Sequence, residues 1–253
     1  MQPVSPYDDG ELYDSLFESQ RDDLPHWTAF VRAGQGPFLD LACGTGRVLL
    51  PLLEAGFDGD GLDESAAMLA RCKAKTVDAG KEPFLLHGDM REFRMPRRYA
   101  RAFCAFNAWA HLLDRESQLA SLRCVREHLL EGGAFAFDLG YARPEIWNAR
   151  PEERVLEGEF THPTRPTRLA LFDRRRMDPS AQTQHSQIEI EERDLHGLLL
   201  RTHVSHTVLR WTMETELEQL FADAGFARWE IRAGFAGEPL TPAAQQMIAT
   251  AWR

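Results

Sequence analysis

Short apolar runs alternate with amphipathic helical stretches between residues 37 and 140. Runs of strand length occupy 37–43, 57–63, 83–89, 99–108 and 134–140. Helical spacing of apolar residues occurs in 47–56, 64–80 and 115–133, and Gly56 and Gly80 close the first two of these segments. Strands separated by helices require right-handed crossovers, which build parallel sheets that are covered on both faces. This part of the chain therefore predicts a doubly wound α/β sheet.

The period of the pattern changes in the second half of the chain. Three longer runs of β type follow one another at 167–178, 182–194 and 198–211, separated only by "PSA" and "LHG". They predict an antiparallel meander with one polar, exposed face, and the Pro-rich segment 161–168 is interpreted as the entry into it. A helix at 212–226 and strands at 227–235 and 246–253 then complete a sheet of seven strands.

These patterns predict one domain over residues 1–253 with three parts. A helical lead occupies 1–35, a Rossmann-like core combines 36–150 with 212–253, and an antiparallel β insertion after the fifth strand covers 151–211. In a sheet of this type ligands bind at the carboxyl ends of the strands, where the strand order reverses.

Composition narrows the class of protein. With 29 basic and 39 acidic residues the net charge is −10, which argues against broad nucleic-acid binding but leaves room for a local basic patch. The acidic start of the chain does not resemble a signal peptide, and no apolar run is long enough for a membrane span. We therefore expect a cytoplasmic protein without membrane or nucleic-acid partners.

Cysteine and histidine spacing gives no metal or disulfide signature. The four cysteines are widely separated and form no C-x-x-C pair, so reduced, buried thiols are expected. The nine histidines lack a helical pattern of the H-E-x-x-H kind. The sequence thus predicts no metal.

The stretch "FLDLACGTGRVLL" at 38–50 is typical of a loop that holds a nucleotide-like ligand. A phosphate-binding P-loop needs a lysine after its last glycine, but Arg47 follows Gly46. A dinucleotide fingerprint would use Gly44 and Gly46 but has Leu49 at its third glycine position, which weakens that interpretation without eliminating it. A nucleoside ligand without phosphate fits both departures.

Such a ligand needs a carboxylate at the end of the second strand for its ribose hydroxyls. Asp63 in "GLDES" stands there. A helix cap near Ser65 is the alternative role for this carboxylate, and the two roles are compatible.

Four blocks, "LDLACGTG", "GLD", "HGDMREF" and "AFNAWAHLLD", resemble the class I S-adenosylmethionine-dependent methyltransferases in order and spacing. The resemblance covers about residues 36–140, and "ELEQLFADAGF" fits the same family's later helix. Within the family, "FNAWAHLLD" is most similar to the glycine and sugar-amine N-methyltransferases, whose antiparallel insertions form a lid. The family resemblance implies S-adenosylmethionine as cofactor and a small-molecule acceptor with an N or O nucleophile. The segment "DLGYARPEIW" matches no substrate motif, so the acceptor stays open.

The resemblance also implies roles for individual residues. Asp63 would bridge the ribose hydroxyls, and Asn107 would face cofactor and substrate. Asp89 would accept a hydrogen bond from the adenine amino group, while Met90 packs on the ring. The methionine end of the cofactor would lie against the N-terminal lead and the glycine loop, specifically Tyr13, Asp40, Ala42, Gly44 and Gly46.

His111 is the candidate general base, because it lies just beyond the fourth strand and titrates in a suitable range. A capping or packing role at the strand–helix junction is the alternative. Three other functions also stay open, namely a methyltransferase acting on RNA or protein, a nicotinamide-dependent oxidoreductase and a non-catalytic cofactor-binding protein. The inserted sheet is a candidate surface for self-association.

Overall fold

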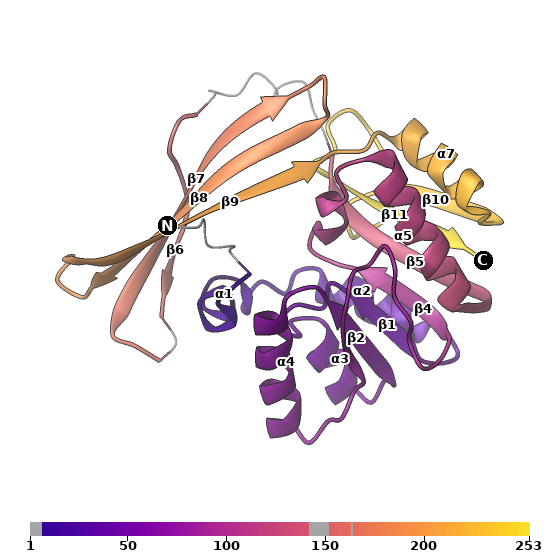
Figure 1. Ribbon diagram of the computed structural model, residues 1–253, viewed down its shortest axis with the longest axis horizontal. Coiled ribbons are helices and arrows are strands. Elements are labelled where there is room, and N and C mark those ends of the chain that lie inside the picture. Colours follow the sequence, from indigo (N-terminus) through magenta and orange to yellow (C-terminus); the bar gives the residue numbers. More distant parts are fainter. Residues whose placement is uncertain (1–6, 142–151, 163) are drawn as a thin grey trace.

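A seven-stranded sheet forms the centre of the molecule, and a four-stranded sheet projects from one side of it (Figure 1). The computed structural model describes residues 7–141, 152–162 and 164–253. The strand order in the large sheet is β10-β11-β5-β4-β1-β2-β3. Its strands are β1 Phe38–Leu41, β2 Gly59–Asp63, β3 Leu85–His87, β4 Tyr99–Cys104, β5 Leu129–Gly140, β10 Arg228–Ala233 and β11 Gln246–Trp252. Strands β1 to β5 are parallel, whereas β11 runs antiparallel to β5 and β10.

Helices cover both faces of this sheet. They are α1 Gly10–Phe17, α2 Leu24–Arg32, α3 Leu49–Glu54, α4 Ala66–Asp78, α5 Arg115–His128 and α7 Glu214–Ala224, with a 3-10 turn η1 at Ala108–His111. Apolar residues of α5 and α7 pack with one face of the sheet, and those of α2, α3 and α4 pack with the other. The predicted doubly wound sheet is confirmed. None of the described helices is long and apolar enough to cross a membrane.

The strand order reverses between β1 and β4, which are neighbours in the sheet although β2 and β3 lie between them in sequence. Asp40 of β1 lies in register with Gly61 of β2 and Phe103 of β4, and Asp63 ends β2 opposite His87. The carboxyl ends of these strands therefore form the crevice in which ligands bind in such folds.

The inserted sheet lies between β5 and α7 in the chain and is antiparallel throughout. It has four strands, β6 Val155–Thr161, β7 Thr167–Asp178, β8 Thr183–Asp194 and β9 Leu199–Arg210. The sequence predicted only the last three. The segment 161–168 does not lead into the sheet but connects β6 to β7, because β6 has already formed before it. The register shifts at a bulge between Leu156 and Gly158, which hides the alternation in the sequence of β6.

Helix α1 joins the inserted sheet to the core. Leu12 and Leu16 on one side of α1 form an apolar cluster with Leu169 of β7 and Ile190 of β8. On another side, the buried carboxylate of Asp14 binds Arg71 Nε at 2.7 Å and Lys75 Nζ at 3.3 Å, both from α4. The N-terminal lead is thus held between two parts of the molecule that are distant in sequence.

A buried polar network holds the base of the inserted sheet. The Arg210 guanidinium donates to Gln118 Oε1 of α5 at 3.1 Å and to Glu216 Oε1 of α7 at 2.6 Å. Gln118 Nε2 in turn donates to the carbonyl oxygen of Leu112, directly after η1, at 3.2 Å. The end of β9 is therefore tied to two core helices and to the turn that carries His111.

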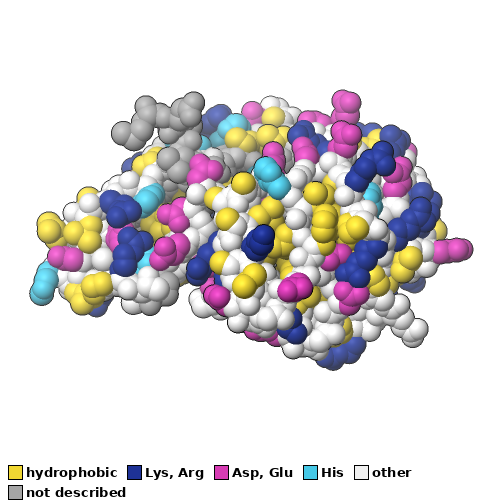
Figure 2. Space-filling view, turned by 60° about the horizontal axis from the view of Figure 1, so that its bottom comes forward, with side chains coloured by type: hydrophobic (Ala, Val, Ile, Leu, Met, Phe, Trp, Pro, Cys, Tyr) yellow, Lys and Arg dark blue, Asp and Glu magenta, His cyan; other side chains and the backbone are white. Residues whose placement is uncertain are grey.

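The opposite end of the inserted sheet is apolar and exposed. Around the turn between β8 and β9, the side chains that are between 44% and 65% exposed are Leu195, Leu198, Leu199 and Leu200. Figure 2 shows hydrophobic side chains gathered at the tip of the projecting sheet, while charged side chains of both signs are interspersed over the core. Burial in the inserted sheet is therefore one-sided and stops short of its tip.

Candidate active site

The glycine turn follows β1 and has an unusual backbone. Ala42, Gly44 and Gly46 have positive φ angles of 55°, 56° and 85°. A Cβ on Gly44 would meet nothing within 4 Å, whereas one on Gly46 would lie 2.9 Å from Cys72 Sγ of α4. Gly44 thus leaves its surroundings open to a ligand, and Gly46 permits close packing of the turn on α4. Leu49 is fully buried, as expected for a loop that seats no pyrophosphate.

Asp63 binds the glycine turn directly. Its Oδ2 accepts the Gly44 N–H at 2.7 Å, and its Oδ1 accepts the Ser65 N–H at 2.8 Å. Burial raises the pKa of Asp63, and these two N–H groups partly offset that rise by stabilising the charged form. The helix cap is Ser65 itself, whose hydroxyl oxygen accepts the Met68 N–H. Asp63 therefore orients the turn and faces the crevice, a geometry that suits a ribose ligand.

Asp40 and Arg47 flank the turn, and both line the crevice. Asp40 is buried, and burial raises its pKa well above the usual range. The Arg47 guanidinium binds both carboxylate oxygens of Asp23, at 2.7 and 2.6 Å, and lies 4.6 Å from the ring centroid of Phe106. Sequence reasoning used Arg47 only to reject a P-loop. The ion pair with Asp23 was not predicted, because nothing in the sequence around Arg47 points to a partner 24 residues earlier.

Asp89 and Met90 follow β3, and both line the crevice. The Asp89 carboxylate is engaged by Arg91, whose Nε lies 2.8 Å from Oδ2 and whose backbone N–H lies 2.8 Å from Oδ1. This bonding holds the pKa of Asp89 below its usual range. An adenine amino group would therefore have to share the carboxylate with Arg91.

The turn after β4 has two successive residues in the left-handed region, Phe106 at φ 63° and Asn107 at φ 59°. The Asn107 N–H donates to Asp138 Oδ2 at 2.9 Å, and Asn107 Oδ1 accepts the Gly140 N–H at 3.0 Å. The amide side chain is thus bound to the end of β5. This region costs a bulky residue such as Phe106 about 1–3 kcal/mol, whereas asparagine adopts it more readily but less freely than glycine does.

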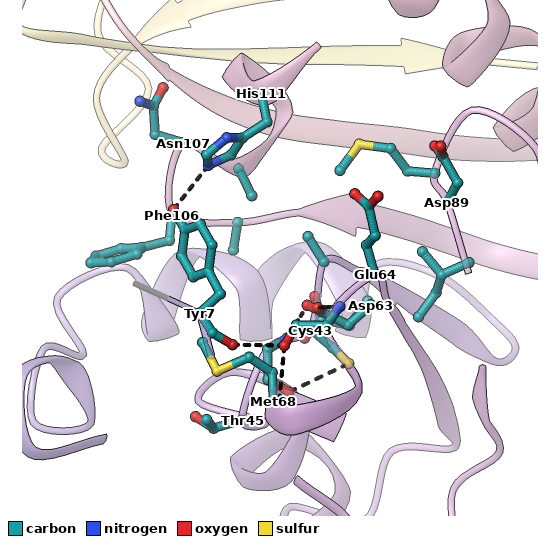
Figure 3. A pocket seen from close by; sticks show the side chains of 18 of the residues that line it. Tyr7, Cys43, Thr45, Asp63, Glu64, Met68, Asp89, Phe106, Asn107 and His111 are labelled. Atoms are coloured by element: carbon teal, nitrogen blue, oxygen red, sulfur yellow. Dashed lines mark hydrogen bonds between the residues drawn. The ribbon is translucent and has the colours of Figure 1, made fainter. Parts of the chain in front are cut away.

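Tyr7 and His111 meet over the crevice (Figure 3). Tyr7 Oη lies 2.9 Å from His111 Nε2, and the rings are nearly perpendicular at 80°. Burial raises the pKa of Tyr7 to about 12 and lowers the pKa of His111, so both groups are neutral near pH 7. The sequence pointed to His111 but not to Tyr7, because a tyrosine in the lead gives no sign of a contact 104 positions away.

Tyr13 belongs to an aromatic wall that the lead builds over the crevice. Ring centroids lie 6.1 Å apart for Tyr7 and Tyr13, 4.9 Å for Tyr13 and Phe17, and 5.5 Å for Phe17 and Phe106. Helix α1 starts where Asp9 Oδ1 accepts the Leu12 N–H at 2.9 Å. This cap fixes the angle at which Tyr13 faces the core.

A cavity of about 910 Å³ joins these groups. The predicted site residues that line it are Tyr13, Asp40, Ala42, Gly44, Asp63, Asp89, Met90, Asn107 and His111. Gly46 lies outside the lining, beneath the turn. The inserted sheet contributes Ile188 and Leu209. Over the described ranges, no three His, Cys, Asp or Glu side chains gather as metal ligands would.

Comparisons with known proteins agree with this geometry. A family model described as a methyltransferase domain matches residues 38–133. A dTDP-3-amino-3,6-dideoxy-alpha-D-glucopyranose N,N-dimethyltransferase of Streptomyces fradiae is 33% identical over 130 residues, 49% of each chain. The cypemycin N-terminal methyltransferase of a Streptomyces species is 26% identical over 253 residues, 98% of each chain. The chain spans half or less of the length of the first curated relatives that it matches.

Solved structures share the whole fold. The CcbJ methyltransferase from Streptomyces caelestis has a TM-score of 0.78 at 23% identity, covering 98% of this chain and 97% of that chain. CalS10, an amino pentose methyltransferase from Micromonospora echinaspora, has a TM-score of 0.73 at 20% identity, covering 95% and 94%. The predicted resemblance to the class I S-adenosylmethionine-dependent methyltransferases is confirmed: residues 38–133 match a methyltransferase domain, and the chain as a whole has the fold of solved methyltransferases.

Proposed function

We propose that this chain is an enzyme that transfers a methyl group from S-adenosylmethionine to an amine nitrogen of a small molecule. The observation that carries the proposal is the cavity itself, which joins the glycine turn and Asp63 to the Tyr7–His111 pair. Two matched relatives are named as N,N-dimethyltransferases of amino sugars, which favours nitrogen over oxygen as the acceptor atom.

The residues present suit an adenosyl ligand without phosphate. Each Asp63 oxygen accepts one N–H and keeps a lone pair for a ribose hydroxyl. Gly44 permits close backbone approach, and the cavity volume of about 910 Å³ lies within the usual range for ligand sites. When bound, S-adenosylmethionine supplies a methyl group on a positively charged sulfur, which is already activated for displacement.

The proposed contacts follow the placement of the lining residues. Asp63 would hold the ribose and Met90 would pack on adenine. The Asp89 carboxylate would accept a hydrogen bond from the adenine amino group while it also binds Arg91. Asn107 would support the turn beside cofactor and substrate. The methionine end would lie against Tyr13, Asp40, Ala42 and Gly44, with Gly46 supporting the turn from below.

The main task of the chain in this proposal is orientation. Holding two reactants in line supplies on the order of 7–11 kcal/mol, whereas a general base adds about a hundred- to ten-thousand-fold. Methylation of an amine releases one proton, and a neutral His111 is able to accept it. Tyr7, bonded to His111 Nε2, would fix the ring orientation.

Replacing His111 by alanine tests this role. His111→Ala is expected to lower turnover about a hundredfold or more while cofactor affinity stays nearly unchanged, because the imidazole acts on the proton and not on the cofactor. Steady-state kinetics and calorimetry measure the two effects, with His196→Ala on the inserted sheet as control. A large loss of cofactor binding would instead make His111 a structural or cofactor residue.

A second acceptor class is supported by one observation. The relative that covers 98% of both chains is named as an N-terminal methyltransferase. An N-terminal amine would present the same kind of nitrogen as an amino sugar, so the two classes differ only in the body of the acceptor.

Ligand binding tests the proposal. The purified chain would be titrated by calorimetry with S-adenosylmethionine, S-adenosylhomocysteine and NADH, beside Asp63→Ala and the distant control Asp58→Ala. Micromolar binding of both adenosyl ligands, lost only in Asp63→Ala, is the expected result. Tight NADH binding without adenosyl binding would overturn it. Methyl-transfer assays against amino sugars, N-terminal amines, phenols and carboxylates would then identify the acceptor.

The remaining predictions are also proposals. The four cysteines are all free in the structure, which supports a reducing, cytoplasmic location. Self-association through the inserted sheet is supported by the exposed leucines around the β8–β9 turn. The absence of a metal, membrane or nucleic-acid partner stays a prediction, as does the division of the chain into lead, core and lid.

A further inference from the structure

The turn at Phe106 and Asn107 places two successive residues of the candidate site in the left-handed region of backbone conformation. Both residues have positive φ angles, both line the cavity, and neither is glycine. The strain therefore needs an external support, and outliers of this kind cluster at functional sites.

Asp138 is that support. It lies on β5 behind the turn, 1% exposed and outside the lining of the cavity. Its Oδ2 accepts the Asn107 N–H and Gln246 Nε2 of β11, each at 2.9 Å. Its Oδ1 is buried and accepts no hydrogen bond within the described ranges. The Phe106 backbone N–H also stabilises the charged form of Asp138, so two of the groups that offset the burial of this carboxylate belong to the turn.

The backbone of the turn at Phe106 and Asn107 continues directly into η1, which carries His111. Asn107 is the first residue before η1, and its carbonyl oxygen accepts the Ala110 N–H at 3.1 Å. One residue later, His111 projects from η1 toward Tyr7, as Figure 3 shows. A rotation at Asn107 would therefore move the His111 ring, and the 2.9 Å contact with Tyr7 leaves little room for such a movement.

We infer that Asp138 is a positioning residue for methyl transfer, holding the strained Phe106–Asn107 turn and thereby placing His111 over the acceptor side of the cavity. The inference rests on the proposed function, because it gives the placement of His111 a purpose. Asp138 touches neither cofactor nor acceptor in this arrangement and acts only through the turn.

A double-mutant cycle tests the inference. Glycine adopts positive φ without strain, so Asn107→Gly removes the need for a support at that residue. The cycle compares the unmodified chain with Asp138→Ala, with Asn107→Gly and with the variant that carries both substitutions. Ile248→Ala is the control, since Ile248 is buried on β11 in register with Asp138 and its side chain cannot accept a hydrogen bond from the turn. Asp138→Leu, which fills similar space without an acceptor oxygen, replaces Asp138→Ala if the latter does not fold.

Two readouts are needed. Turnover is expected to fall about tenfold or more in Asp138→Ala, with the dissociation constant for S-adenosylmethionine changing less than about threefold. The double variant is expected to stay within about threefold of Asn107→Gly alone. The second readout, independent of activity, is the imidazole ¹⁵N spectrum of His111, which should move in Asp138→Ala and stay unchanged in Ile248→Ala.

The outcomes separate this inference from the proposed function. Unchanged turnover and an unchanged His111 spectrum in Asp138→Ala would overturn the inference, as would equal losses in Asp138→Ala and Ile248→Ala or a lack of rescue in the double variant. If the unmodified chain binds no adenosyl ligand and transfers no methyl group, the proposed function is wrong. The His111 spectra would then still decide whether Asp138 places that ring.

Discussion

The central sheet and the inserted sheet differ in how many of their faces are covered. β1 is buried at all four positions because helices cover both sides, whereas β6 is partly or fully exposed at every position. The core thus fixes the glycine turn and Asp63 within a rigid framework. Among its described residues, the inserted sheet contributes Ile188 and Leu209 to the cavity, and it leaves its tip exposed. In the proposed function, the cofactor would therefore lie against the core, whose strands are covered on both faces, and the acceptor would lie nearer to the less buried inserted sheet.

The largest expected effect comes from a buried ion pair in the core. Arg47→Met would leave the Asp23 carboxylate, 7% exposed, without its bidentate partner. Removing one member of such a pair costs about 3–5 kcal/mol. Urea denaturation measures the loss, and adding Asp23→Asn should recover part of it. A loss below 1 kcal/mol would mean that the core tolerates charge as readily as the inserted sheet does.

Asp138 should give the core a distinctive pH dependence. Burial raises the pKa of Asp138 from 3.8 to about 6, so between these values the folded state binds the proton that the unfolded state has released. The free energy of unfolding therefore falls as pH rises through this window, by at most about 3 kcal/mol from this group, and levels off above pH 6. Chemical denaturation from pH 4 to 7 should show this contribution as a difference between the unmodified chain and Asp138→Asn. A constant difference across the range would contradict it.

The junction between the two regions should give an intermediate effect. Arg210→Met removes the hydrogen bonds to Gln118 and Glu216 and is expected to cost about 2 kcal/mol. Because the network joins β9 to the core, the inserted sheet should become more sensitive to limited proteolysis than the core. Equal rates of cleavage in both regions would show that the network stabilises the molecule as a whole.

The smallest effect is expected on the outer face of the inserted sheet. Arg154 binds Glu189 at 2.6 Å and Glu191 at 2.7 Å and lies over the Phe172 ring, but the site is partly exposed. Partly exposed pairs are worth little, so Arg154→Met should change the free energy of unfolding by about 1 kcal/mol or less. A loss as large as that of Arg47→Met would remove the energetic distinction between the two sheets.

Local patterns predicted the seven-stranded sheet, and the motifs at its strand ends and in the N-terminal lead pointed to nine of the residues that line the cavity, because those features depend on short-range periodicity and on loops at strand ends. The first inserted strand was missed because a bulge and flanking prolines mask its alternation. The role of Gly46 at the ligand stays a prediction, and the Cys72 sulfur, 2.9 Å from where a Cβ on Gly46 would lie, adds a packing role that spacing alone does not reveal.

The alternation of strands and helices, the glycine turn and the placement of Asp63 at a strand end could all be read from residues close together in the chain, and the family resemblance from the order of such blocks. The contacts of Tyr7 with His111, of Arg47 with Asp23 and of Asp138 with Asn107 became visible only in the folded chain. These contacts join segments 24 to 104 residues apart, and only the packing of the whole sheet brings such groups within hydrogen-bonding distance.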